Sequence, residues 1–373
     1  MQKRRVPVDL LYVRHDGLDG NHSDAALVPI VCHRPLMSIC RHVVNGTDSL
    51  DAYWDWAERQ GSVLDRDAHL AEWKRKARWS RWTSSSPRPT IASIDRDRLL
   101  LASGVEQACL SKAVDSRWMW VDMPDEVASL WDRRSVDALN LVVRETGRKK
   151  FYNPVLHEEY RRARIVRPDS IRIDRIRRLF GPDGPGLRGL DIGCNMGYMT
   201  HMLYRHGVDM MGVDLAEGHL CVARALNITY GLDTKFVNSQ FQQLEATADF
   251  PIVIFLTVMY HALNRSHNEA VGMIERIEQF GPSVLIWESG SDPALEIDLI
   301  LEHSGLSAYL PLGQTRATGK DRELGVFVRP GTALSESLEA RYKAELAAEF
   351  ADTSAWPGEA GTKQVADLRQ TGD

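Results

Sequence analysis

From residue 187 onward, short apolar runs alternate with longer segments that have helical spacing. The runs that fit strands are Leu187–Ile192, Val208–Asp214, Thr234–Gln240, Phe250–Leu256, Val284–Glu288, Ala308–Gln314 and Arg322–Val328. Strands that are separated by helices usually form a parallel sheet. Phe250–Leu256 is apolar throughout, which is typical of a strand buried on both faces of such a sheet. The pattern therefore predicts an α/β domain in this half of the chain.

The first 130 residues follow a less regular pattern, and they hold most of the tryptophans of the chain. The expected elements are a strand over Val6–Arg14, a turn at Gly17–Asn21, a helical stretch over Leu50–Trp82, strands over Thr90–Ile94 and Arg98–Ala102, a helix from Val105 and a strand over Trp118–Met123. The prolines and clustered serines of Ser84–Pro89 end the helical stretch, because they interrupt helix periodicity. This mixture predicts a smaller α+β N-terminal domain.

The segments outside these two domains are polar. Residues 131–180 are rich in arginine and are expected to form a helical connection. Tyr152, His157 and Tyr160 in it are candidates for a lid, although a plain interdomain helix is the favoured interpretation. Ser335–Phe350 predicts one helix, and no periodicity follows it. The expected division is an N-terminal domain over 1–130, a connection over 131–180, an α/β domain over 181–330, and a C-terminal helix with a disordered tail over 331–373.

Charge and cysteine content narrow the function classes. The chain has 373 residues, with 46 basic and 51 acidic side chains, so a net charge of -5 gives it no overall attraction to nucleic acid or anionic membranes. The five cysteines are scattered without a C-x-x-C pair, which argues against a zinc or redox centre. The sequence shows no apolar run of about 18 residues and no signal-peptide pattern. We therefore expect a cytoplasmic protein with reduced thiols, no metal and no membrane span.

A glycine-containing turn stands between the first predicted strand and its helix. It contains Asp191, Gly193, Asn195 and Gly197, and the helix begins at Tyr198. Glycine adopts backbone angles that a side chain forbids, so the turn can approach a ligand closely, near the N-terminal amides of the helix. The alternative is a buried turn in which an aspartate only caps the helix.

A second acidic residue completes the arrangement. Asp214 ends the next predicted strand, about two dozen residues after Asp191. In a doubly wound sheet this position faces the crevice at the switch point, where a carboxylate can accept both hydroxyls of a ribose. The combination of strand, turn, helix, strand and terminal carboxylate is more specific than a glycine turn alone.

These residues resemble the first motif of the class I S-adenosylmethionine-dependent methyltransferases, an acidic residue followed by glycines at alternate positions. Asp191, Gly193 and Gly197 match, while Asn195 replaces the middle glycine and tolerates unusual backbone angles. The resemblance implies S-adenosylmethionine as cofactor, with Asp191 acting on its amino-acid part through the turn and Asp214 holding its ribose. It also implies a Rossmann-like domain with a seven-stranded, mostly parallel sheet that ends in an antiparallel hairpin around Gly319.

The resemblance places the rest of the cofactor site in the loops after the strands. The further candidates are Cys194, Tyr198, Leu215, Gln240, Phe241 and Thr257. Gln240 stands where the family usually has an acidic residue against the adenine amino group, and its side-chain carbonyl can accept the same hydrogen bond.

The acceptor side of the site is expected after Phe250–Leu256. Methyl transfer from a sulfonium depends mainly on positioning. His261 is the candidate base for a hydroxyl acceptor, because imidazole changes charge near neutral pH; a histidine that only hydrogen-bonds a loop is the alternative. Tyr260 and Trp287 are candidate pocket walls, although aromatic residues at strand ends are more often core. For Glu288 three roles stay open: assisting the base, contacting substrate, or capping the next helix.

Two basic segments and one segment of the N-terminal domain give weaker indications of function. Lys74–Trp82 interleaves cations with tryptophan, which suits a phosphorylated or nucleic-acid ligand but also a solvated helix face. Arg161–Arg178 is expected to be a solvated face. The segment Thr90–Ala113 resembles a degenerate ParB-like or sulfiredoxin-like unit, in which Gly104 remains but the acid and the histidine-arginine pair are lost. This resemblance implies a binding or scaffolding front domain.

Three functions follow from these observations. The leading hypothesis is O-methylation of a small molecule, or of a glycan or its phosphate, in a biosynthetic pathway. The second is methylation of tRNA or another nucleic acid, and the third is a non-catalytic scaffold that keeps the cofactor fold. A homodimer is compatible with each of them.

Overall fold

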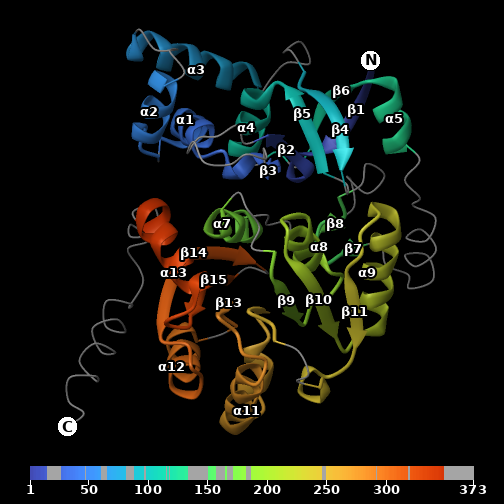
Figure 1. The fold of residues 1–373 in the computed structure, drawn as a ribbon, viewed down its shortest axis with the longest axis vertical. Coiled ribbons are helices and arrows are strands. Elements are labelled where there is room, and N and C mark those ends of the chain that lie inside the picture. Colours follow the sequence, from blue (N-terminus) through green and yellow to red (C-terminus); the bar gives the residue numbers. More distant parts are fainter. Residues whose placement is uncertain are drawn as a thin grey trace. The chain divides into compact units, whose positions relative to one another are not determined.

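The computed structural model describes most of the chain (Figure 1). The described residues are 1–14, 27–46, 48–59, 65–80, 88–95, 98–114, 116, 118–132, 150–156, 164–165, 171–181, 186–245, 249–290, 292–317 and 320–347. The chain divides into two compact units, residues 1–241 and residues 242–373. The predicted turns at Gly17–Asn21 and Gly319, the lid candidates His157 and Tyr160, and the predicted disordered tail lie outside the described residues.

A six-stranded sheet lies at the start of the chain, in the order β1-β6-β4-β5-β2-β3. Its strands are β1 (Gln2–Pro7), β2 (Leu11–Arg14), β3 (Leu27–Pro29), β4 (Thr90–Asp95), β5 (Arg98–Ser103) and β6 (Trp118–Met123). The last three agree with the sequence prediction. The single strand expected over Val6–Arg14 is wrong, because the chain leaves β1 at Pro7 and makes a 3-10 turn over Val8–Leu10 before β2. Proline has no N–H for a ladder, so it suits the end of a strand.

Five helices accompany this sheet among the described residues. They are α1 (Arg34–Asn45), α2 (Asp51–Arg59), α3 (Arg66–Ser80), α4 (Val105–Ala113) and α5 (Asp125–Asp132), and the short turn Ile30–Cys32 precedes α1. The continuous helical stretch expected over Leu50–Trp82 is therefore divided between α2 and α3. Gly104 begins α4 with a φ of 76°, and a Cβ there would lie 2.6 Å from the Cα of Pro89. Glycine is required at that turn both for its backbone angle and for its size.

The predicted connection is only partly helical. It contains two short strands, β7 (Lys150–Phe151) and β8 (Arg164–Ile165), and then α7 (Ile171–Phe180). Tyr152 lies in an irregular segment after β7, so the structure does not extend a helix through it. The solvated face expected over Arg161–Arg178 is wrong for Arg172 and Arg177, whose exposed fractions are 4% and 1%. Both point into a core that supplies polar partners, which the sequence alone does not show.

The second sheet has seven strands in the order β11-β10-β9-β12-β13-β15-β14. They are β9 (Arg188–Ile192), β10 (Asp209–Asp214), β11 (Lys235–Asn238), β12 (Ile252–Leu256), β13 (Val284–Glu288), β14 (Ala308–Ala317) and β15 (Lys320–Val328). Strand β10 runs parallel to β9 and β11, and β12 runs parallel to β13. Strand β15 runs antiparallel to both of its neighbours, β13 and β14. The predicted seven-stranded, mostly parallel α/β fold is confirmed.

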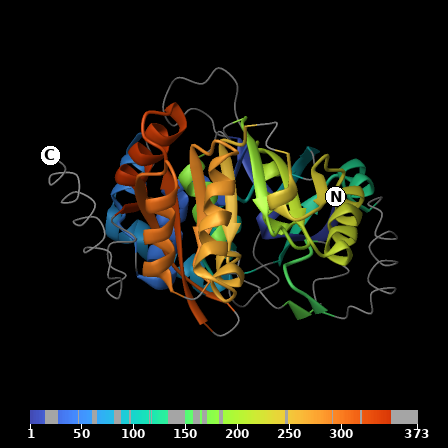
Figure 2. The same cartoon turned by 90° about the horizontal axis from the view of Figure 1, so that it is seen from below.

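Helices follow most of these strands, as the periodicity predicts. They are α8 (Tyr198–Arg205), α9 (Glu217–Tyr230), α10 (Met259–Leu263), α11 (His267–Glu278), α12 (Pro293–His303) and α13 (Ala333–Arg341). A 3-10 turn over Phe241–Gln243 and a π-helical segment over Tyr342–Leu346 accompany them. Helices α11 and α12 pack side by side (Figure 2). Across the part of the chain that the structure describes, no helix combines the length and apolar character needed to cross a membrane.

Candidate functional site

The turn after β9 has left-handed backbone angles at alternate residues. The φ values are 73° at Gly193, 52° at Asn195 and 75° at Gly197. The amides of Gly193 and Cys194 both donate to the carbonyl of Val213, at 2.8 and 3.0 Å, which ties the turn to the end of β10. Glycine adopts positive φ without steric strain, and asparagine does so more readily than most other residues, which suits the three positions to this sequence.

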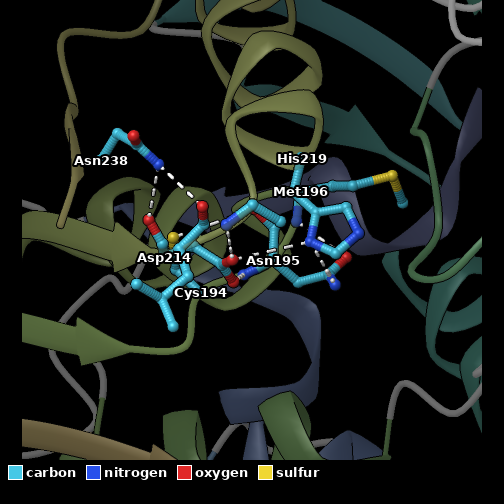
Figure 3. A network of polar contacts seen from close by, with 8 residues as sticks. Cys194, Asn195, Met196, Asp214, His219 and Asn238 are labelled. Carbon is cyan, nitrogen blue, oxygen red and sulfur yellow. Dashed lines mark hydrogen bonds and ion pairs between the residues drawn. The ribbon is translucent and has the colours of Figure 1, made fainter. Parts of the chain in front are cut away.

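Asp214 receives hydrogen bonds from two backbone amides at the end of β10 (Figure 3). Its Oδ2 accepts from the Asn195 amide and its Oδ1 from the Ala216 amide, both at 2.8 Å. Burial alone would raise the pKa of this carboxyl, but the His219 ring beside it and the hydrogen bonds from these two amides lower it overall. A carboxylate oxygen has two lone-pair sites, so each Asp214 oxygen keeps the capacity for another donor.

The chain just beyond Asp214 is held by Asn238, at the end of β11. The Asn238 side-chain amide donates to the carbonyls of Asp214 and Leu215, at 3.1 and 3.0 Å. Leu215 is 67% exposed, so an apolar side chain lies open to solvent next to this carboxylate. Gln240 is exposed, whereas Phe241 is buried. The loops after the neighbouring strands β10 and β11 therefore carry the carboxylate of Asp214, the apolar side chain of Leu215 and the exposed side-chain amide of Gln240.

Asp191 lies at the end of β9 and is hydrogen-bonded to the first turn of α8. Its Oδ2 accepts a 2.6 Å hydrogen bond from the hydroxyl of Thr200 in the first turn of α8. The side chain is 4% exposed, and burial raises its pKa to about 6 although the Thr200 hydrogen bonds act in the opposite direction. Asp191 thus fixes the start of α8 and influences the turn through that helix.

Tyr198, the first residue of α8, points into a buried ion network of unit 1–241. Burial, together with the carboxylates of Asp9 and Asp174, raises its pKa well above the usual range. Lys112 joins the two carboxylates, since its Nζ lies 2.6 Å from both Asp9 Oδ1 and Asp174 Oδ2. Arg177 donates a hydrogen bond to the hydroxyl of Tyr12, at 3.3 Å. The front sheet, α4, α7 and α8 meet at this network.

In unit 242–373 the loop after β12 is strained. Thr257 has a φ of 57°, which is uncommon for a β-branched residue, and its amide donates to the Glu288 carbonyl at 3.0 Å. Strained backbone of this kind concentrates at functional sites. The rings of Tyr260 and His261 follow in α10, with centroids 4.0 Å apart. A Cβ at Gly290 would overlap the Cβ of Tyr260, so glycine there leaves the space that Tyr260 fills.

The polar candidates of this unit differ in accessibility. His261 is exposed, and its pKa is lowered by partial burial and by the nearby charge of Arg265. Glu288 is fully buried, and its Oε1 accepts a 2.6 Å hydrogen bond from the Thr315 hydroxyl. Helix α12 is capped by Asp292, whose Oδ1 accepts from the Leu295 amide at 3.2 Å. The suggested role of Glu288 as that cap is therefore wrong.

Trp287 is a core residue rather than a pocket wall. It is fully buried, and its indole N–H donates to Glu296 at 3.0 Å. Tyr309 and Phe327 pack against its ring.

Comparison with known proteins identifies the domain. Residues 190–278 match a family model described as a methyltransferase domain. The match covers β9 to β12 of the second sheet, so this part of the chain belongs to a methyltransferase domain. S-adenosylmethionine is its cofactor.

Curated O-methyltransferases are similar to part of this chain over part of their own length. The ubiquinone biosynthesis O-methyltransferase of Ruegeria pomeroyi is 30% identical over 138 residues, which cover 34% of this chain and 54% of the relative. The enzyme of the same name from Azorhizobium caulinodans is 36% identical over 95 residues, covering 24% of this chain and 38% of the relative. The chain thus spans about half the length, or less, of these relatives.

Two solved structures are also similar to part of the chain. The bifunctional kinase-methyltransferase WbdD matches with a TM-score of 0.39 and 19% identity, over 51% of this chain and 46% of that protein. Magnesium protoporphyrin IX methyltransferase from Synechocystis PCC 6803, solved with S-adenosylmethionine, gives a TM-score of 0.35 and 22% identity, over 42% of this chain and 90% of that protein.

Most of the predicted cofactor residues lie together in unit 1–241, around the turn after β9. The group that meets around the turn comprises Asp191, Gly193, Cys194, Asn195, Gly197, Asp214 and Leu215. Thr257, Tyr260, His261 and Glu288 lie in unit 242–373. His219, Asn238 and Thr200 were missed by the sequence analysis, and only Asn238, a polar residue within the predicted strand and loop of Thr234–Gln240, carried a signal that could have identified it.

The donor and acceptor groups around the turn suit the cofactor. Asp214 keeps acceptor capacity on both oxygens for two ribose hydroxyls, and exposed Leu215 offers an apolar face for an adenine. Among the described residues, no cluster of three or more His, Cys, Asp or Glu side chains could hold a metal ion.

Proposed function

We propose that the chain catalyses S-adenosylmethionine-dependent O-methylation of a small molecule, or of a glycan or its phosphate, in a biosynthetic pathway. The observation that carries the proposal is the turn at Gly193–Gly197, whose Asn195 amide holds the carboxylate of Asp214 at the end of β10. The curated relatives support oxygen as the methylated atom, because both are named O-methyltransferases.

In this proposal the turn and the ends of β10 and β11 hold the cofactor. Asp214 accepts the two ribose hydroxyls, and Leu215 packs on the adenine. Gln240, exposed after β11, accepts from the adenine amino group, with Phe241 supporting that segment from the core. The backbone from Gly193 to Gly197 lies along the amino-acid part, and Asp191 fixes its position through α8.

On the acceptor side we assign His261 as the base. The cofactor supplies a methyl group on a positive sulfur, which leaves as a neutral thioether. His261 takes the proton of the acceptor hydroxyl as the new carbon–oxygen bond forms, and its lowered pKa keeps the ring neutral and able to accept that proton at physiological pH. The Tyr260 ring lies tilted beside the His261 ring and orients it. Buried Glu288 positions the end of β13 through Thr315.

The remaining parts of the chain extend the proposal. We assign residues 1–130 as a binding or scaffolding domain with a degenerate ParB-like segment, and residues 131–180 as its connection to the methyltransferase domain. We further propose a cytoplasmic location. A homodimer is compatible with this assignment.

The proposal is tested by incubating the protein with S-adenosylmethionine and sets of phenols, sugars and sugar phosphates, while S-adenosylhomocysteine release is measured. We expect release with at least one hydroxyl acceptor. Methylation of tRNA without turnover of any small acceptor would overturn the acceptor assignment. Cofactor binding without turnover of either class would favour the scaffold.

A variant pair tests the assigned base. His261→Ala should lower kcat by about a hundredfold, the scale of general-base catalysis, and leave cofactor affinity nearly unchanged. His267→Ala, at an exposed histidine that begins α11, is the matched control and should keep full activity. Full turnover by His261→Ala would show that another group accepts the proton.

A further inference from the structure

Asn195 is the one departure of the cofactor turn from alternating glycines, and its side chain is fully engaged there. Its φ of 52° carries a cost that glycine does not pay. The Asn195 Oδ1 accepts from the Met196 amide at 2.9 Å, and its Nδ2 lies 3.1 Å from Nδ1 of His219 in α9 (Figure 3). The amide group therefore joins the turn to the helix that follows β10.

The direction of these hydrogen bonds follows from their partners. A backbone N–H can only donate, so the atom facing the Met196 amide is the Asn195 oxygen, and the atom facing His219 is the amide nitrogen, a donor. His219 Nδ1 must then accept. This bond requires a neutral ring with its proton on Nε2.

The hydrogen bond between Asn195 and His219 is linked through the backbone to Asp214, the carboxylate assigned to the ribose. The Asn195 amide donates to Asp214 Oδ2 at 2.8 Å, and His219 Nδ1 lies 3.7 Å from Asp214 Oδ1. The side chains of His219 and Asp214 are only 24% and 14% exposed. A change in the left-handed angle at Asn195 would turn its amide away from Asp214.

We propose that His219 is a positioning residue for cofactor binding. It accepts the Asn195 side-chain hydrogen bond, stabilises the left-handed conformation at Asn195, and so keeps the Asn195 amide on the carboxylate of Asp214. This inference rests on the proposed function, because it deepens the assignment of Asp214 to the ribose. It also explains how this chain uses asparagine where the family pattern has glycine.

The substitutions separate positioning from a direct contact. His219→Ala removes the acceptor and should weaken S-adenosylhomocysteine binding about five- to tenfold, the effect of losing one partly buried hydrogen bond. His219→Gln keeps an acceptor and should restore affinity to within about threefold of the wild type. His219→Lys offers only donors and should be as weak as the alanine variant. The kcat at saturating cofactor should change little in all three.

Asn195→Gly provides the decisive background. Glycine holds the left-handed angle without a side-chain partner, so His219→Ala should have no further effect in an Asn195→Gly protein. A histidine that contacts the cofactor or Asp214 directly would instead weaken binding equally in both backgrounds. Glu217→Ala, at an exposed residue of the same helix that pairs with Arg224, is the control and should bind like the wild type.

The experiment is calorimetric titration of these full-length variants with S-adenosylhomocysteine, after circular dichroism has shown that each is folded. Loss in His219→Ala that disappears in the Asn195→Gly background confirms the inference. Unchanged affinity in His219→Ala, or equal loss in both backgrounds, overturns it while the proposed function stands. A wild-type protein that binds no S-adenosylhomocysteine overturns both.

Discussion

Replacing Asp191 with asparagine should stabilise the folded protein at alkaline pH. Asp191 is 4% exposed, and burial raises its pKa from an ordinary value of 3.8 to about 6. The folded chain then binds more protons than the unfolded chain between these values, so stability falls as the pH rises through this window and stays low above it. One pKa unit corresponds to about 1.4 kcal/mol, which makes the ionised carboxylate cost up to about 3 kcal/mol at pH 8.

Asparagine removes that cost, because it is neutral in both states and its amide oxygen can still accept from the Thr200 hydroxyl. Urea unfolding without cofactor should show Asp191→Asn more stable than the wild type by about 1 to 3 kcal/mol at pH 8, and by about half as much at pH 5. Asp298→Asn, at an exposed position of α12, should change stability by less than about 0.5 kcal/mol. Equal or lower stability of Asp191→Asn at pH 8 would refute the argument.

Two further substitutions test the buried network and the loop after β12. Lys112→Met leaves the carboxylates of Asp9 and Asp174 without their shared cation, so it should lower the free energy of unfolding by about 3 to 5 kcal/mol in urea titrations. The control Lys343→Met, at an exposed lysine, should lower it by less than about 0.5 kcal/mol. Similar losses in the two variants would contradict a buried network. Gly290→Ala introduces a methyl group that displaces Tyr260, so steady-state kinetics should show a tenfold or greater fall in kcat, by order of magnitude, with cofactor affinity kept. An unchanged kcat would show that the position of Tyr260 does not matter.

Local pattern was sufficient for much of the sheet. The predicted bounds of β6 and β13 agree with the structure at both ends, and the turn from Gly193 to Gly197 has the left-handed backbone angles that its glycines indicate. These features are set by residues that are close in sequence: a short apolar run, a glycine that takes a positive φ, and a carboxylate at a strand end. The spacing of apolar residues and the backbone preferences of single residues are therefore enough to predict these strands and this turn.

Features that depend on distant partners were not predictable. Arg177 is buried because Asp9 and Tyr12 reach it from other elements, and nothing in the spacing of α7 shows this. The contact of His219 with Asn195 likewise depends on how α9 is rotated against the turn. The break of Val6–Arg14 at Pro7 could have been expected from proline chemistry, but the strand-like composition outweighed it.

The most direct test of the whole account is cofactor affinity at the end of β10. Calorimetric titration with S-adenosylmethionine should show saturable binding to the wild type and an affinity at least about a hundredfold lower in Asp214→Ala, since two hydrogen bonds to a charged acceptor are lost. Asp233→Ala, at an exposed aspartate of the same unit, should bind like the wild type. An Asp214→Ala protein with wild-type affinity would contradict the assignment of the ribose to this carboxylate.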